Sequence, residues 1–338
     1  MSSLFLTSVT RISDMADSPW QSEALGFDQW EDGDYTLAEV VGEPNIYYRV
    51  ELSSGRTVQT FPGDRVVGAL GHRAATLEAV GSWRAVGADR AMHALTGAGL
   101  FGRCTSLAPF FMPPMSLRYL GHVQRNGRKL RMSDFAVQSA PVTLRAPVVL
   151  LVGTSMSAGK TTAGRLVVHE LASRGLKVIA GKLTGAGRFR DVLSFRDAGA
   201  AHVFDFVDAG LASTVVPEHK YLEAIRPLIS RIAALGPDVV VVEAGASPLE
   251  PYNGAGAIDE VANQVRCTCL CASDPYSVVG VTTAFGLKPD LVTGPATNTT
   301  AGIELVEKLT GIEAINVFSP NARRDLGMVL ERCLSLTA

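Results

Sequence analysis

The chain has 338 residues, of which 19% are charged, and its formal net charge is −2. This length allows two domains with a sizeable core, and the near-balanced charge excludes a general electrostatic attraction to nucleic acid or to an anionic membrane. Five cysteines, an odd number in a long chain, favour a reducing compartment over a disulfide framework. We therefore expect a soluble cytoplasmic protein with neither a signal peptide nor a membrane span.

The first part of the chain has the pattern of a small β-rich domain. Short apolar runs between residues 35 and 70 are separated by turn clusters such as Gly42-Glu43-Pro44, which predicts several strands. Runs at 116–124 and 128–132 flank Asn126-Gly127, a strong hairpin signal. Residues 74–86 and 89–95 are expected to form short helices between them. We expect residues 1–145 to be a β-rich domain, of barrel type, that serves substrate recognition or oligomerisation.

The predicted hairpin is rich in basic residues, namely Arg118, His122, Arg125, Arg128, Lys129 and Arg131. One interpretation is a clamp for an anionic substrate or for phosphates, and the other is a solvated surface, which is what charge runs usually form. Residues 138–147 contain two prolines and are expected to be a linker, with the domain boundary near 140–146.

The stretch VVLLVGTSMSAGKTT, residues 148–162, predicts a strand, a tight loop and the start of a helix. Such a loop binds phosphate, because its backbone N–H groups and the helix N-terminus converge on the anion while the lysine reaches the terminal phosphates. The spacing departs from G-x-x-x-x-G-K-[ST], since Thr154 stands where the first glycine is expected. The residues expected to bind nucleotide here are Gly153, Thr154, Ser155, Ser157, Ala158, Gly159, Lys160, Thr161 and Thr162.

Strand and helix patterns alternate after this loop. Strands are expected at 177–182, 237–243, 264–272, 290–293 and 314–318, and helices at 159–174, 219–235, 276–285, 300–309 and 321–334. Alternation with nearly continuous apolar strands predicts an α/β domain over residues 146–338, with a mainly parallel sheet covered by helices on both faces. Ligands of such sheets bind beyond the carboxyl ends of the strands.

Several polar residues follow these predicted strands at the edge where the phosphate loop must lie. Glu243 is expected to order Mg²⁺ or a water near the terminal phosphate, and Lys182 to neutralise charge that develops during phosphoryl transfer. Asp191 is a candidate for a second Mg²⁺ contact. Asn298 is expected to bind the nucleobase, and the missing N/T-K-x-D guanine motif favours ATP.

Three cysteines, Cys267, Cys269 and Cys271, alternate along one predicted strand, so their side chains share a face. Paired zinc ligands usually occur as C-x-x-C, which is missing here. We therefore expect these thiols to be buried as small hydrophobic side chains.

Two segments resemble known P-loop enzymes of the SIMIBI class. GTSMSAGKTT resembles the phosphate loop of dethiobiotin synthetase, and VVEAGASPLEP resembles the VEGAG-type segment of dethiobiotin synthetase and cobyric acid synthase. The resemblance covers roughly residues 146–335, and Lys182 lies where those enzymes place a lysine after their second strand. The chain is also similar to a family of uncharacterised proteins that join an N-terminal domain to such a P-loop domain, some linked to acyl transfer onto amino acids.

In the named enzymes ATP phosphorylates a carboxylate or carbamate, and an amine then attacks the mixed anhydride. The resemblance implies that Lys160 and Thr161 bind the β/γ-phosphates and Mg²⁺, that Glu243 helps to hold Mg²⁺, and that Lys182 stabilises the acceptor or the transferring phosphoryl group. We therefore expect Lys160, Lys182 and Glu243 to be catalytic and Thr161, Glu243 and Asp191 to be metal ligands.

The function expected from these patterns is an ATP-dependent ligase or small-molecule kinase that acts on a small acid and forms a homo-oligomer. Two alternatives stay open. One is a regulatory or metal-chaperone NTPase of the same P-loop class, and the other is a non-hydrolysing relative that binds a phosphorylated metabolite or transfers acyl groups.

Overall fold

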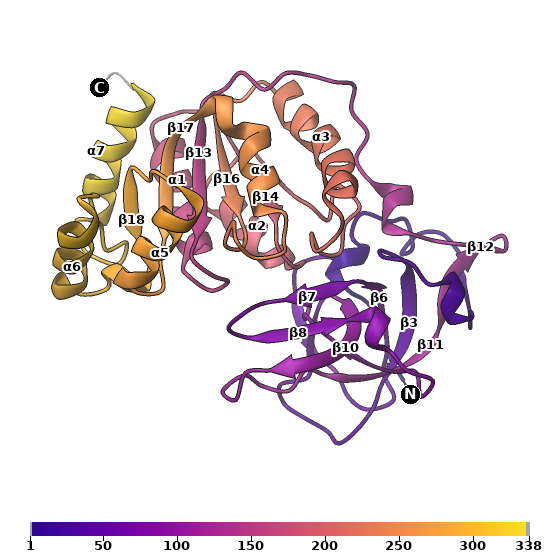
Figure 1. Ribbon diagram of the computed structural model, residues 1–338. Helices are drawn as coiled ribbons and strands as arrows, with labels where there is room; N and C mark the ends of the chain where they lie inside the picture. Colours follow the sequence, from indigo (N-terminus) through magenta and orange to yellow (C-terminus); the bar gives the residue numbers. More distant parts are fainter. Residues whose placement is uncertain (1, 336–338) are drawn as a thin grey trace. The chain divides into compact units, whose positions relative to one another are not determined.

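The computed structural model describes residues 2–335, which form two compact units (Figure 1). The first unit comprises Met1–Gln138, Ala186–Arg190 and Phe206–Ala224. The second comprises Ser139–Gly185, Asp191–Asp205 and Ile225–Ala338. The two short segments taken into the first unit were not foreseen, and the division into domains 1–145 and 146–338 stays a prediction.

The first unit is built on strands whose pairing closes into a ring, in the order β6–β3–β11–β9–β10 and back to β6. These strands are β3 (Tyr35–Val40), β6 (Arg65–Leu70), β9 (Ala91–Ala94), β10 (Leu100–Leu107) and β11 (Ser116–Arg125). Closure removes free sheet edges and encloses a core that includes Ala38, Val66, Leu70, Phe101 and Leu117. The predicted β-rich part is confirmed.

Shorter elements surround this ring. The strands are β1 (Leu4–Leu6), β2 (Gln21–Glu23), β4 (Arg49–Glu51), β5 (Thr57–Gln59), β7 (His72–Ala74), β8 (Ala79–Ser82) and β12 (Arg128–Lys129). The 3-10 helices are η1 (Ser8–Thr10), η2 (Phe27–Gln29), η3 (Trp83–Ala85) and η4 (Met132–Phe135). The predicted hairpin is formed by β11 and β12, and Asn126 and Gly127 have φ values of 52° and 73°, as its two-residue turn requires.

The predicted helices at 74–86 and 89–95 are wrong. Most of these residues lie in β8, η3 and β9, and burial alternates along both strands, with Ala79 buried, Val80 exposed and Gly81 buried. A period of two belongs to a strand, and pairing of β8 with β7 and β10 stabilises it over the helical tendency of the alanines.

The second unit contains a six-stranded parallel sheet in the order β15–β14–β16–β13–β17–β18. Its strands are β13 (Val148–Gly153), β14 (Val178–Thr184), β15 (His202–Asp205), β16 (Val239–Ala244), β17 (Val265–Cys271) and β18 (Leu291–Thr293). Every residue of β13, β14 and β16 is buried, as continuous apolar runs in a parallel sheet predict. The α/β fold class is confirmed.

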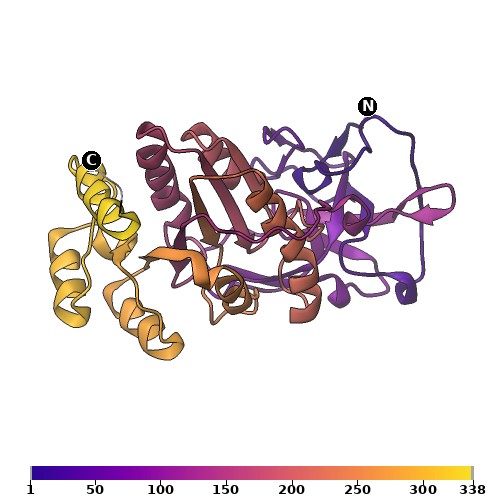
Figure 2. The ribbon, with the colours of Figure 1, turned by 90° about the horizontal axis from the view of Figure 1, so that it is seen from above.

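The helices are α1 (Lys160–Ser173), α2 (Phe189–Asp197), α3 (Glu218–Ala234), α4 (Gly254–Val261), α5 (Pro275–Phe285), α6 (Thr300–Thr310) and α7 (Ala322–Leu334). In the strand order, the β13–α1–β14 connection moves two positions toward β15, whereas the β16–α4–β17 connection moves two positions toward β18. Because such crossovers are right-handed, α1 and α4 cover opposite faces (Figures 1 and 2).

Four elements after the phosphate loop differ from the sequence prediction. Residues 314–318 form no strand, and only an isolated bridge joins Val292 to Ala314. Helices α2 and α4 and strand β15 were not predicted, because each is short and its apolar pattern is weak. Among residues 2–335, no helix combines the length and apolar character needed to cross a membrane.

Candidate functional site

The loop between β13 and α1 wraps around the amino group of Lys160. This residue begins α1 directly after Gly159, whose φ of 95° is in the left-handed region that favours glycine. Lys160 Nζ donates a hydrogen bond to the carbonyl oxygen of Ser155 at 2.7 Å, and the residue is only 4% exposed. A Cβ on Gly153 would lie 2.4 Å from this amino group and 3.0 Å from the carbonyl oxygen of Ser155, so glycine at the strand end lets the lysine lie against the loop backbone.

The carboxyl ends of β14 and β16 bring the other predicted residues to the same edge of the sheet. In the strand register, Glu243 pairs with Leu151 of β13 on one side and with Lys182 of β14 on the other. Thr161 Oγ1 donates to Glu243 Oε2 at 3.1 Å, and Lys182 Nζ lies 3.5 Å from Glu243 Oε1. The nearly inaccessible carboxylate of Glu243 thus joins the first turn of α1 to the second lysine.

Lys182 also forms an ion pair with Asp191, at 2.6 Å between Nζ and Oδ2. Burial alone would lower the pKa of Lys182, but the carboxylates of Asp191 and Glu243 outweigh burial and raise it well above its ordinary value. For Lys160, burial is the larger effect and lowers the pKa, although the charge of Glu243 opposes it. The site therefore holds two buried amines: carboxylates raise the pKa of Lys182, and burial lowers the pKa of Lys160 at the start of α1.

The segment after Glu243 packs against the end of β14. The N–H of Gly245 donates to Thr184 Oγ1 at 2.9 Å, and a Cβ on Gly245 would lie 2.0 Å from the carbonyl oxygen of Thr184. Only glycine allows this approach, which fixes the backbone that follows Glu243 at the sheet edge.

The remaining predicted residues lie around this loop. Ser155 and Ala158 are buried, Thr154 is partly exposed, and Ser157 and Thr162 are exposed. Asn298 is exposed just after η6 (Pro295–Thr297), which begins after Gly294. Gly294 packs on the phosphate loop, because a Cβ there would lie 2.5 Å from the carbonyl oxygen of Ala158.

Sequence reasoning missed two acidic residues near the lysines. Asp205 ends β15, pairs with Lys182 in the strand register, and helps to raise the pKa of that lysine. Glu250 accepts a hydrogen bond from the backbone N–H of Ser247 at 2.8 Å, and its charge acts on Lys160. The four-residue strand that ends at Asp205 was too short to be recognised from the sequence. Glu250 lies in the segment SPLEP after the predicted strand 237–243, so its position could have indicated a site residue.

The basic hairpin residues are engaged in ion pairs inside the first unit. The pairs are Arg118 with Glu39, Arg125 with Asp14, Arg128 with Asp134, Lys129 with Asp34 and Arg131 with Glu31. His122 hydrogen-bonds to Tyr119 at 2.6 Å and is fully buried. Because acidic partners already neutralise these cations, the hairpin does not have the character of an anion clamp.

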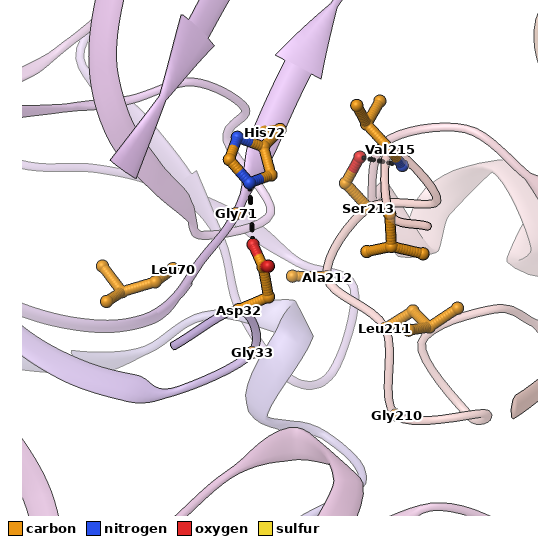
Figure 3. A pocket seen from close by; sticks show the side chains of 11 residues that line it. Asp32, Gly33, Leu70, Gly71, His72, Gly210, Leu211, Ala212, Ser213 and Val215 are labelled. Atoms are coloured by element: carbon orange, nitrogen blue, oxygen red, sulfur yellow. Dashed lines mark hydrogen bonds and ion pairs between the residues drawn. The ribbon is translucent and has the colours of Figure 1, made fainter. Parts of the chain in front are cut away.

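A small cavity in the first unit lies between residues 32–33 and 70–72 and the segment 210–216 (Figure 3). Asp32 accepts hydrogen bonds from His72 at 2.8 Å and from Trp83 at 2.6 Å. Burial raises the pKa of Asp32, but these partners outweigh it and hold the pKa below its usual value. The cavity has a volume of about 30 Å³, which suits water rather than an organic ligand.

The three alternating cysteines are buried, as predicted. Cys267 also lies near Cys333 of α7 and Asp290, and the three potential ligand atoms are all within 4.8 Å of one another. This grouping comes from residues far apart in the sequence, so the local spacing of the cysteines could not reveal it.

Comparison with known proteins gives similarity at the level of fold. No protein-family model and no curated protein matches the chain. Among solved structures, the signal recognition particle receptor FtsY from Elizabethkingia anophelis is 17% identical with a TM-score of 0.37, covering 57% of this chain and 66% of its own. FtsY from Thermotoga maritima is 15% identical with a TM-score of 0.36, covering 61% and 74%.

The 54 kDa signal recognition particle protein from Aeropyrum pernix, in complex with GDP, is 21% identical with a TM-score of 0.33, covering 58% of this chain and 51% of its own. This chain therefore spans from about half to three quarters of these proteins, and identities this low concern the fold alone. The parallel sheet, the phosphate loop and the lysine that begins α1 define a P-loop NTPase fold.

Two expectations are corrected. The similar solved structures are signal recognition particle proteins and receptors, which contradicts the expected ATP-dependent ligase or small-molecule kinase. The detailed resemblance to dethiobiotin synthetase is likewise unsupported, and the coarser P-loop class stands.

Proposed function

We propose that the second unit binds a Mg²⁺–nucleoside triphosphate and hydrolyses it, and that the protein is a regulatory NTPase. The observation that carries this proposal is the convergence of Lys160, Thr161, Glu243 and Lys182 at one edge of the sheet. Each of the four supplies a function that phosphoryl chemistry needs, and none is contributed by the first unit.

Lys160 is the residue that would bind the terminal phosphates. In the structure its amine donates to a neutral carbonyl oxygen, that of Ser155, which is a weaker acceptor than an ionised phosphate. Backbone N–H groups of the loop and the N-terminus of the 14-residue helix α1 favour an anion at the same place. We expect the lysine to exchange its carbonyl partner for phosphate.

Thr161 and Glu243 fit a magnesium ion. Their facing atoms are a hydroxyl and a carboxylate oxygen, the hard donors that Mg²⁺ prefers, and they already lie within hydrogen-bond distance of each other. When bound, Mg²⁺ supplies charge neutralisation at the phosphates. Asp191, expected from the sequence as a further metal ligand, instead pairs with Lys182, so we assign it to positioning that lysine.

Lys182 would stabilise the negative charge that develops as the terminal phosphate leaves. Its raised pKa keeps it protonated throughout the neutral range, and its two carboxylate partners hold its position. Asn298, on the segment that packs against the phosphate loop through Gly294, is proposed to contact the nucleobase.

The regulatory part of the proposal rests on α2, the helix that follows β14. Its first two backbone N–H groups, of Phe189 and Arg190, each donate to the carboxylate of Glu51 at 2.8 Å within the first unit. The next residue, Asp191, pairs with Lys182 in the second unit. A change of nucleotide state at Lys182 therefore acts on a helix whose first two residues belong to the first unit.

The experiment is phosphate release from ATP and from GTP by the full chain, with and without Mg²⁺. We expect Mg²⁺-dependent release that falls at least about 100-fold in Lys160→Ala, while Lys288→Ala, at an exposed lysine, leaves it unchanged. Unaltered hydrolysis in Lys160→Ala would contradict the proposal. A drop in release from ATP or from GTP alone in Asn298→Ala would place that residue at the base.

A further inference from the structure

The first unit also contains a cavity larger than the one beside Asp32, with a volume of about 170 Å³. All charged residues that line it are arginines: Arg49, Arg73 and Arg188. Most of the other walls are apolar, from side chains such as Tyr47, Leu95, Leu107, Phe111, Met112 and Pro114. Positive charge above an apolar wall is the complement of an organic anion.

Two of the lining residues have a buried polar atom without a hydrogen-bond partner anywhere in residues 2–335, and these atoms are Arg73 Nε and Thr96 Oγ1. Arg73 is 7% exposed and Thr96 is 6% exposed. Buried donors of this kind cost free energy unless something pairs with them. Both residues line the same cavity, so its wall contains two donors for which the described residues supply no acceptor.

The rest of the Arg73 side chain is held firmly. One terminal nitrogen donates to the carbonyl oxygen of Leu95 at 2.5 Å, the other pairs with Glu78, and the guanidinium lies 5.3 Å from the ring centroid of Phe111. Its Nε–H has no acceptor among residues 2–335. This arrangement preorganises one donor at a fixed place, which lowers the entropy cost of binding.

Arg49 and Arg188 provide the positive charge that the pocket offers to a ligand. Glu78 neutralises Arg73, whereas no ion pair within residues 2–335 involves Arg49 or Arg188. The apolar side chains near them are accessible, since Tyr47 is 61% exposed and Met112 is 48% exposed. An inorganic ion would leave these surfaces in water, so the occupant must carry an apolar body as well as a negative charge.

We propose that this pocket binds a small organic anion, a carboxylate attached to an apolar or aromatic body. The carboxylate is held by Arg188 and Arg49 together with the unpaired donors of Arg73 and Thr96, and the body packs on Phe111 and its apolar neighbours. The first unit is then a metabolite-binding module, a role that does not depend on nucleotide hydrolysis by the second.

The test is calorimetric titration of the full chain with phenylacetate, with its neutral analogue phenylacetamide and with inorganic phosphate. We expect saturable binding of phenylacetate, at least about tenfold weaker binding of the amide, because it lacks charge-assisted hydrogen bonds, and no comparable binding of phosphate. Equal affinity for the acid and the amide, or no saturable binding of phenylacetate at millimolar concentration, would overturn the proposal.

Matched variants locate the binding. Arg188→Met keeps an apolar stem and should weaken phenylacetate about tenfold, whereas Arg190→Met, two residues away and outside the lining, should not. Thr96→Val removes the buried hydroxyl at nearly constant shape, so it should also weaken binding without unfolding the protein. Equal affinity of Arg188→Met and the wild type for phenylacetate would contradict the assignment of the binding site to this pocket. Lys160→Ala should bind phenylacetate normally, so this result stands apart from the nucleotide proposal.

Discussion

Thr161 and Glu243 lie 82 positions apart in the sequence, yet the hydroxyl of the first donates to the carboxylate of the second at 3.1 Å. The contact exists because β13 and β16 are neighbours in the sheet, so the helix that follows one strand meets the carboxyl end of the other. Glu243 thereby accepts a hydrogen bond from Thr161 and forms an ion pair with Lys182. Several consequences of this arrangement can be measured.

The first prediction concerns Glu243→Gln. The amide keeps the size and hydrogen-bonding capacity of the side chain but loses the charge that would hold Mg²⁺, so the Mg²⁺ concentration for half-maximal hydrolysis should rise about tenfold or more. Titration of hydrolysis with Mg²⁺ measures this. Glu260→Gln, on the surface of α4, is the control, and an unchanged Mg²⁺ requirement in Glu243→Gln would remove that residue from the metal site.

The second prediction concerns Lys182→Met. Replacing the buried amine leaves Asp191 and Glu243 without their cation, which should lower the free energy of unfolding by about 3–5 kcal/mol at pH 7. Because the pKa of Lys182 is raised in the folded state, its contribution is fully present below the unfolded pKa of about 10.4 and is lost as pH rises through the folded value.

Urea unfolding of the wild type and Lys182→Met at several pH values tests this sign. The difference between the two proteins should stay constant from pH 7 to about 9 and shrink only above about 10.4. A difference that disappears near neutral pH would show that Lys182 is not held protonated by its partners.

The third prediction compares two glycines. Gly245→Ala places a Cβ about 2.0 Å from the carbonyl oxygen of Thr184, so the backbone must shift and the free energy of unfolding should fall by about 1–3 kcal/mol, together with hydrolysis. Gly280→Ala, at an exposed position of α5 where a Cβ would meet nothing within 4 Å, should instead raise the free energy of unfolding by about 0.5–1 kcal/mol. Thermal unfolding of both variants tests whether the two changes in stability have opposite signs. An unchanged stability in Gly245→Ala would contradict the close approach of residue 245 to the carbonyl oxygen of Thr184.

The fourth prediction concerns Glu51, which accepts hydrogen bonds from Ser8 Oγ and from the first two N–H groups of α2. Glu51→Ala leaves those N–H groups unpaired, so the opening free energy of Phe189 and Arg190 should fall by about 1–3 kcal/mol. Amide hydrogen exchange measures it residue by residue.

Glu43→Ala, at an exposed turn, is the control for this variant. If α2 transmits the nucleotide state, adding nucleotide with Mg²⁺ should alter exchange at Asp191 in the wild type, and this change should no longer reach residues 189 and 190 in Glu51→Ala. Unchanged exchange at all three residues on adding nucleotide would contradict a regulatory role for α2.

Sequence patterns were most informative where the physical cause is local. The apolar run 148–152, the glycines of the loop and Lys160 specify a strand, a turn and a helix by themselves, because side-chain burial, backbone freedom and helix initiation act over a few residues. Asn126-Gly127 likewise specified its hairpin. The local pattern gave the wrong structure at 74–86, where pairing of β8 with β7 and β10 stabilises a strand instead of a helix. It also missed β15, because a strand of four residues is too short to show a clear periodicity.

The sequence alone determined the P-loop, the parallel sheet, the β-rich first part and the identities of Lys160, Lys182 and Glu243 as residues of one sheet edge. Only the tertiary structure decided which charges meet: Asp191 and Asp205 act on Lys182, acidic partners neutralise the basic hairpin, and three arginines share an apolar pocket. The reason is that strand order and chain packing set distances between charges, and neither is encoded in the spacing of residues along the chain.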